Sequence, residues 1–234
     1  DRYPGRVDAV RPSINYLKAR WLREAGPQGA VSKIRRIIGA HPGTDAAAYG
    51  GLAIGRIYES QGKRREAASR YESAADALPE SPVAPEALER ALDLYVEAGE
   101  FDSAVDVGRR IIAGYPGRES AFGALDGLER ALRATGRLDE SVALSEDIIR
   151  GDPESRLAPR SLLTVCRMYL DRGMLAEAFP VAERIRREYP LSVSARWASE
   201  DVYRKYRELG GPAEAERGLR KRLSTATPSQ LPEV

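Results

Sequence analysis

Residues 99–116, GEFDSAVDVGRRIIAGYP, contain the pattern that decides the fold of this chain. Gly99 is followed five residues later by Ala104, and Pro116 comes twelve residues after that alanine. Glycine ends the preceding helix because it adopts the left-handed backbone conformation without steric cost. Proline ends the following helix because it has no backbone N–H and restricts the residue before it. The segment between them is therefore predicted to be one short helix.

This pattern recurs along the whole chain with a period of 37 residues. The recurring prolines, 38 residues apart once and 37 residues apart thereafter, are Pro4, Pro42, Pro79, Pro116, Pro153 and Pro190. An alanine follows each of them by five residues, at Ala9, Ala47, Ala84, Ala121, Ala158 and Ala195. The glycines that end first helices are Gly62, Gly99, Gly136, Gly173 and Gly210. Apolar residues recur at helical spacing, which predicts an all-α array whose helix pairs bury their apolar faces against their neighbours.

Each repeat is predicted to hold two helices. The first helices are expected near 7–24, 45–61, 82–97, 119–134, 156–171 and 193–208. The second helices are expected near 28–39, 64–77, 101–114, 138–151, 175–188 and 212–224. Pro180 lies inside the helix expected at 175–188 and is predicted to kink or shorten it.

The helix pairs are predicted to form one continuous array over residues 1–224. Its units lie near 4–41, 42–78, 79–115, 116–152, 153–189 and 190–224. Arg2-Tyr3-Pro4-Gly5-Arg6 is similar to Gly114-Tyr115-Pro116-Gly117-Arg118, so the chain is expected to be a segment of a longer array. Residues 225–234 are expected to be a C-terminal tail or the start of a further repeat.

The charge balance argues against a nucleic-acid partner. The formal net charge is +2, with 37 basic and 35 acidic side chains, so no bulk attraction to a polyanion is expected. No apolar run reaches the ~18 residues of a membrane span, so direct membrane insertion is not expected. A single cysteine excludes an internal disulfide framework.

Two residues invite a catalytic interpretation, and both are better explained structurally. Cys166 occupies the repeat position of Gly55 and Leu92, which predicts a buried small side chain. His41 directly precedes Pro42 and is expected to be structural or exposed. One cysteine and one histidine cannot build a multi-ligand zinc site, and no phosphate-binding glycine loop is present. We therefore expect no catalytic residue, no cofactor and no metal, and a protein that is not an enzyme.

The spacing of glycine, alanine and proline within residues 99–116 resembles that of the tetratricopeptide repeat (TPR) family. This resemblance extends over nearly the whole chain and implies a right-handed superhelical solenoid of about six helix hairpins. The family's usual repeat has about 34 residues, whereas this unit has a longer link, as in Ser81-Pro82-Val83-Ala84-Pro85. The longer unit is similar to repeats of bacterial cell-envelope proteins, such as the periplasmic coordinator of the Tol–Pal system and the lipoprotein of the outer-membrane β-barrel assembly machine. A periplasmic or envelope-associated location is therefore favoured over a cytoplasmic one.

The resemblance also implies a partner-binding surface, because in this family the first helices line a concave groove. The expected groove residues are Arg56, Asp93, Arg130, Arg133, Arg160, Arg167, Arg204 and Arg207, with the aromatic Tyr49 and Trp197. Glu86, Glu89 and Asp93 are expected to make the middle of the groove acidic and leave its C-terminal half basic. Such an arginine row could hold the carboxylates of an extended acidic peptide. Alternatively, the arginines pair with carboxylates of neighbouring repeats or are only solvated.

Three functions are compatible with these features. The leading hypothesis is a non-catalytic protein-interaction scaffold that binds a protein or acidic peptide in the groove. The alternative is a helical, substrate-guiding module of a larger enzyme acting on polysaccharide or peptidoglycan, which exposed Trp and Tyr side chains would favour. Self-association through terminal repeats is the third, because terminal units without polar caps tend to stack. The dominance of arginine in the row favours the scaffold.

Overall fold

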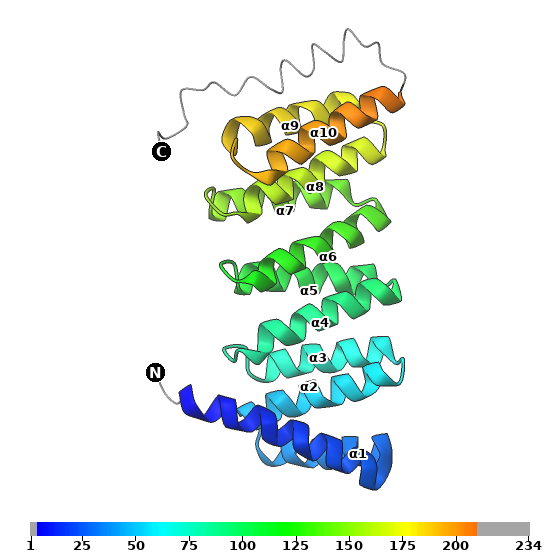
Figure 1. Cartoon of the computed structure of the whole chain (residues 1–234), viewed down its shortest axis with the longest axis vertical. Helices are drawn as coiled ribbons and strands as arrows, with labels where there is room; N and C mark the ends of the chain where they lie inside the picture. Colours follow the sequence, from blue (N-terminus) through cyan, green and yellow to red (C-terminus); the bar gives the residue numbers. More distant parts are fainter. Residues whose placement is uncertain (1–3, 210–234) are drawn as a thin grey trace. The chain divides into compact units, whose positions relative to one another are not determined.

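The computed structural model describes residues 4–209, and it describes side chains from residue 13 onward. All regular elements in this part of the chain are α-helices, and they form packed antiparallel pairs (Figure 1). They are α1 Pro4–Ala40, α2 Asp45–Ser60, α3 Arg64–Ala77, α4 Val83–Ala98, α5 Phe101–Gly114, α6 Glu119–Thr135, α7 Leu138–Gly151, α8 Leu157–Asp171, α9 Leu175–Glu188 and α10 Val193–Glu208. The all-α prediction of helix hairpins is confirmed. The helix expected at 212–224 and the segment 225–234 lie outside the described residues.

The chain divides into two compact units, Asp1–Ala131 and Leu132–Val234, and the division falls within α6. In the first unit, α1 to α5 pack in chain order, and α2 also contacts α4. In the second unit, α7 to α10 pack in chain order, and α8 also contacts α10. The contacts α2–α4 and α8–α10 join first helices of neighbouring repeats. The faces on which groove residues were predicted therefore lie next to one another within each unit.

The glycines and prolines of the repeat set the helix ends. Gly62, Gly99, Gly136 and Gly173 all have φ between 67° and 75°, in the left-handed region. The residues before the prolines leave the helical region, as Leu78 does with φ −153° and ψ 76°. From α2 to α10, every observed helix end lies within one residue of its predicted position.

The first repeat differs slightly from the prediction of two separate helices at 7–24 and 28–39. The backbone there forms the single element α1, which is interrupted at Gly26 by a non-helical conformation with φ 67° and ψ −177°. The irregular glycine of the first repeat thus still separates its two helical halves, without a loop between them.

Pro180 was predicted to kink or shorten its helix, and the helix is not shortened. Helix α9 has 14 residues, as do α3, α5 and α7. Pro180 and Ala176, whose carbonyl would accept the missing backbone hydrogen bond, are both exposed. Water can therefore hydrate that carbonyl, and the helix continues through the proline.

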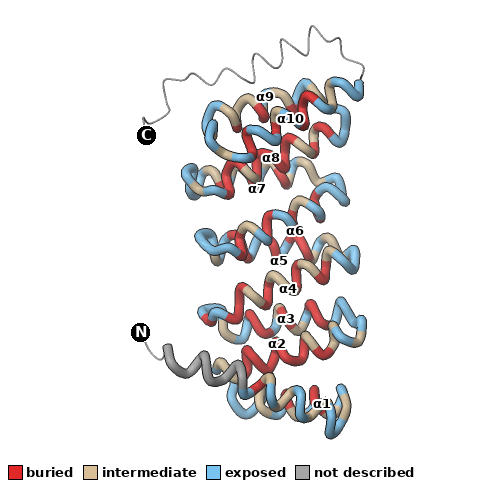
Figure 2. The backbone as a smooth tube through the Cα atoms, in the orientation of Figure 1, coloured by how far each residue is buried: buried red, intermediate tan, exposed pale blue. Residues whose placement is uncertain are grey.

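Small residues of the repeat lie where helices approach one another. Four glycines inside helices, Gly50, Gly55, Gly108 and Gly127, form recesses that large side chains of a neighbouring helix fill. A Cβ atom at Gly55 would lie 2.6 Å from the Tyr71 ring, and one at Gly127 would lie 2.7 Å from Leu92. Buried residues follow the helices, whereas the loops are largely exposed (Figure 2). None of the helices within residues 4–209 is long and apolar enough to cross a lipid bilayer.

Candidate functional site

In the first unit, the predicted groove residues form ion pairs between neighbouring first helices. Arg56 on α2 donates from Nη2 to Oε1 of Glu86 on α4 at 2.8 Å. Arg130 on α6 donates from Nη2 to Oδ1 of Asp93 on α4 at 3.2 Å. Each of these side chains is about one third exposed or more, so each pair contributes at most about 1 kcal/mol. The arginines of this unit therefore carry structural ion pairs between repeats.

A hollow of about 580 Å³ lies beside the Arg56–Glu86 pair. Its lining residues are Arg56, Glu59, Ser60, Tyr71, Glu86, Glu89 and Arg90. They include three carboxylates and two guanidiniums, so the lining is net acidic. Burial, together with the neighbouring carboxylates of Asp93, Glu86 and Glu119, raises the pKa of Glu89. The charged form of Glu89 is therefore less favourable in the folded protein than in the unfolded chain.

Glu89→Gln is expected to stabilise the protein at neutral pH. Glu89 stands three residues after Glu86 and four before Asp93 on α4, and like charges at these helical spacings cost about 0.2–0.5 kcal/mol per pair. Because the folded-state pKa of Glu89 is raised, its carboxylate reduces stability above that pKa and this penalty disappears as the pH falls below it. Thermal unfolding should therefore show a higher Tm for the variant at pH 7 and a shrinking difference towards pH 4.

Asp106→Asn removes one exposed carboxylate from α5 and serves as the control for charge alone. An equal gain in this control, or a gain for Glu89→Gln that does not depend on pH, would contradict the expected cause.

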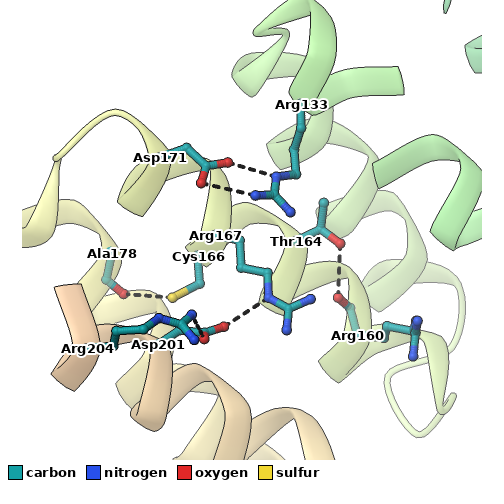
Figure 3. Close-up of polar contacts among 9 residues, drawn as sticks. All are labelled: Arg133, Arg160, Thr164, Cys166, Arg167, Asp171, Ala178, Asp201 and Arg204. Carbon is teal, nitrogen blue, oxygen red and sulfur yellow. Dashed lines mark hydrogen bonds and ion pairs between the residues drawn. The ribbon is translucent and has the colours of Figure 1, made fainter. Parts of the chain in front are cut away.

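In the second unit, two aspartates hold three of the predicted arginines (Figure 3). Arg133 binds Asp171 with two hydrogen bonds, Nε to Oδ2 at 2.7 Å and Nη2 to Oδ1 at 3.1 Å. Arg167 donates from Nε to Oδ2 of Asp201 at 2.9 Å, and Arg204 donates to the other oxygen of the same carboxylate. Asp201 is only 7% exposed. It therefore fixes two guanidiniums from neighbouring first helices in one geometry.

These residues surround a second hollow, of about 370 Å³. Its lining residues are Arg133, Arg167, Leu170, Asp171, Asp201, Arg204, Lys205 and Glu208. Four of them are basic and three are acidic, so the lining is net basic. We call this site the basic hollow. It brings together Arg133, Arg167 and Arg204, which come from three different repeats.

The other predicted groove residues lie in different environments. Trp197 on α10 is 36% exposed, and the Arg167 guanidinium lies over its ring at 5.9 Å from the ring centre. Tyr49 on α2 is only 7% exposed, so its ring offers little surface to a partner. Arg160 on α8 is half-buried, and its carbonyl accepts a hydrogen bond from Thr164 Oγ1 at 3.3 Å (Figure 3). Arg207 is exposed near the end of α10.

Sequence reasoning did not single out Asp171 and Asp201, which position the arginines of the basic hollow. A signal for them was present in the repeat. Asp171 lies 38 residues after Arg133, and Asp201 lies 34 residues after Arg167. A carboxylate about one repeat away from a groove arginine lies on the neighbouring first helix, where it can form an ion pair with that arginine.

The structure places Cys166 in the core and His41 at the surface. Cys166 is fully buried, and its thiol donates to the Ala178 carbonyl oxygen at an Sγ–O distance of 3.6 Å (Figure 3). Burial, with a smaller effect from the Asp201 carboxylate, raises the pKa of the Cys166 thiol to about 12. The nucleophilic thiolate is thus disfavoured at neutral pH. His41 is exposed in the turn after α1, and the described residues contain no group of His, Cys, Asp and Glu that could hold a metal ion.

Comparisons with known proteins agree with the repeat. Residues 52–119 match the family model of the tetratricopeptide repeat, a module that in general binds other proteins. No curated protein matches the chain significantly. This matched segment contains the C-terminal part of α2 and all of α3, α4 and α5.

Several solved structures are similar to the chain. TPR-like repeats of a putative kinesin light chain from Podosopora anserina are 21% identical, with 78% of this chain and 94% of that chain covered and a TM-score of 0.46. The protein MamA from AMB-1 is 19% identical, with 82% and 96% covered and a TM-score of 0.45. A tetratricopeptide repeat protein from Parabacteroides merdae is 16% identical, with 92% and 99% covered and a TM-score of 0.37.

Proposed function

We propose that this chain is a non-catalytic scaffold that binds a protein partner, and that the basic hollow holds an acidic segment of that partner. The observation that carries this proposal is the convergence of Arg133, Arg167 and Arg204 on one hollow. Guanidinium groups bind carboxylates with paired, charge-assisted hydrogen bonds. The repeat match at residues 52–119 supports an interaction module.

The aspartates of the hollow support recognition by holding the arginines in place. A guanidinium has five N–H donors, so one side chain can serve an internal carboxylate and a partner carboxylate together. The side chain of Arg204 is 64% exposed although it is bound to Asp201. Lys205 adds a second cation beside it. Cations that are already oriented lose less conformational entropy when a partner binds.

The lining of the basic hollow favours a peptide over a polysaccharide. Sugar-binding sites use open aromatic faces for stacking, and none of the residues that line this hollow is aromatic. Trp197 lies beside the hollow but does not line it, and the Arg167 guanidinium lies over one face of its ring. The module of a polysaccharide-acting enzyme is therefore the weaker of the two proposals.

A bacterial cell-envelope location is part of the proposal and follows only from the resemblance of the 37-residue unit. Fractionation of cells that express the full-length protein with its native N-terminus tests it. Recovery with the periplasm or the membranes is expected, and recovery in the cytoplasmic fraction would contradict the location without affecting the binding proposal.

Fluorescence anisotropy with two labelled peptides tests the acidic partner. The peptides have the same sequence except that one carries Glu where the other carries Gln. At low salt, the wild-type protein is expected to bind the Glu peptide roughly tenfold more tightly, a difference of about 1.4 kcal/mol. The double variant Arg133→Gln, Arg204→Gln should lose most of this preference, because it removes two cations from the hollow.

The matched control is Arg150→Gln, Arg187→Gln, which removes two exposed arginines from α7 and α9. It changes the net charge by the same amount and should retain the preference. Equal losses in both double variants would mean unspecific attraction. No preference in the wild-type protein would reject the acidic partner.

A further inference from the structure

An exposed apolar patch lies at the beginning of α10. Val193 is 54% exposed and Trp197 is 36% exposed. They stand four residues apart on one helix, so their side chains lie on the same face, one turn apart. Neighbouring large apolar side chains on a surface are typical of interaction sites. We call Val193 and Trp197 the apolar patch.

The apolar patch adjoins the basic hollow through one side chain. The Arg167 guanidinium lies over the Trp197 ring at 5.9 Å. The same guanidinium lines the hollow and donates to Asp201, which also binds Arg204 (Figure 3). A partner segment that reaches the exposed arginine can therefore also contact the patch. The two surfaces form one site with an apolar end and a basic end.

The geometry of α10 sets the spacing of the backbone positions that carry the two ends. Trp197 and Arg204 are seven residues apart, which is about two helical turns and roughly 10 Å along one face. In a polyproline II segment, residues three apart lie on the same side and about 9 Å apart. In a β-strand, residues on the same side are two or four apart, at about 7 or 13 Å. Of these two extended conformations, the polyproline II spacing matches better, whereas an α-helical segment would match with residues seven apart.

We infer that the partner segment is acidic, adopts the polyproline II conformation and carries a large apolar residue three positions from an Asp or Glu. The apolar side chain covers Val193 and Trp197, and the carboxylate binds Arg204 beside Arg167. This inference rests on the proposed function of the basic hollow and adds the spacing and the apolar contact. The net positive lining of the hollow favours the acidic residue of the partner segment, and the apolar patch favours its large apolar residue.

Peptides of identical composition that differ only in spacing test the inference. Each labelled peptide carries one Leu and one Glu in a background of Ala, Ser and Gln, separated by two, three, four or seven positions. Separation three is expected to bind roughly tenfold more tightly than two, four or seven, because only there do both contacts form together in a polyproline II segment. Equal affinities at all separations would overturn the inference. Strongest binding at two or four would indicate a strand, and strongest binding at seven a helix, and either result would reject the polyproline II conformation.

Trp197→Ala tests the apolar contact directly. It should abolish the advantage of the Leu peptide over a matched peptide with Ser in place of Leu. Val193→Ser should reduce the same advantage. Because Val193 is more exposed than Trp197, this second variant is expected to fold even if Trp197→Ala does not. The control is Tyr16→Ala, which removes an aromatic ring that is 64% exposed on α1 and should change neither affinity.

The outcomes separate this inference from the function on which it rests. If the wild-type protein prefers Glu over Gln peptides but treats Leu and Ser peptides alike, the acidic partner stands and the apolar contact is rejected. If no peptide with Glu binds better than its Gln counterpart, the proposed function of the hollow is rejected as well.

Discussion

Gly55→Ala is expected to lower the free energy of unfolding by about 2 kcal/mol, although alanine is the better helix former. The added Cβ would lie 2.6 Å from Cε1 and 2.8 Å from Cδ1 of the Tyr71 ring. Tyr71 has little room to move, because it is 1% exposed and its hydroxyl donates to Glu59 Oε2 at 2.8 Å. Overpacking of this kind forces backbone or rotamer shifts that cost about 1–3 kcal/mol.

Chemical denaturation of the variant and of Gly151→Ala checks this expectation. Gly151 is the last residue of α7, and no atom would lie within 4 Å of a Cβ placed there. Gly151→Ala should therefore be neutral or stabilising by up to about 1 kcal/mol. In a Tyr71→Leu background the cost of Gly55→Ala should fall sharply, since the ring is gone. The same cost in both backgrounds would show that the Tyr71 contact is not the cause.

The repeat position of Gly55 shows what the sequence could predict and what it could not. Leu92 and Cys166 occupy the same position in other repeats, and both are buried as expected for a contact between helices. Which residue of the neighbouring helix packs against this position depends on several side chains at once. Tyr71 fills the recess at Gly55, Leu92 itself fills the recess at Gly127, and Cys166 packs beside Ala178. Residue size at one position predicts burial, but not which neighbour fills the space.

Helix ends were predictable to within one residue from α2 to α10 because single residues encode them locally. Gly99 ends α4 through its own left-handed conformation, whatever packs around it. The candidate site is different, because an arginine on an exposed face has several carboxylates within reach. The 37-residue period predicted which residues form the row of groove residues. The hydrogen bond from Arg167 to Asp201 could not be predicted in this way, because it depends on how α8 and α10 pack together.

Asp201→Asn is expected to change stability and binding in opposite directions. Asp201 is 7% exposed and accepts hydrogen bonds from Arg167 and Arg204. Asparagine keeps the size but removes the charge, and hydrogen bonds to charged groups contribute about 1.5–3 kcal/mol. Because both arginines remain partly exposed, we expect a loss near the lower end, about 2 kcal/mol. At the same time, the affinity for the Glu peptide should rise roughly fivefold, since the loss of competition from the internal carboxylate outweighs the loss of the orientation that it gives the arginines.

Denaturant unfolding and peptide anisotropy on the same samples measure the two effects. Asp147→Asn is the control, because Asp147 pairs with Arg150 on α7 and its side chain is 67% exposed; it should change stability by less than about 0.5 kcal/mol and leave binding unchanged. A loss of both stability and affinity in Asp201→Asn would mean that Asp201 serves binding only by holding the arginines in place. A rise in affinity despite lower stability would identify Asp201 as the internal substitute for the partner carboxylate. The hollow would then be a site in which the folded chain keeps its binding cations paired until an acidic segment arrives.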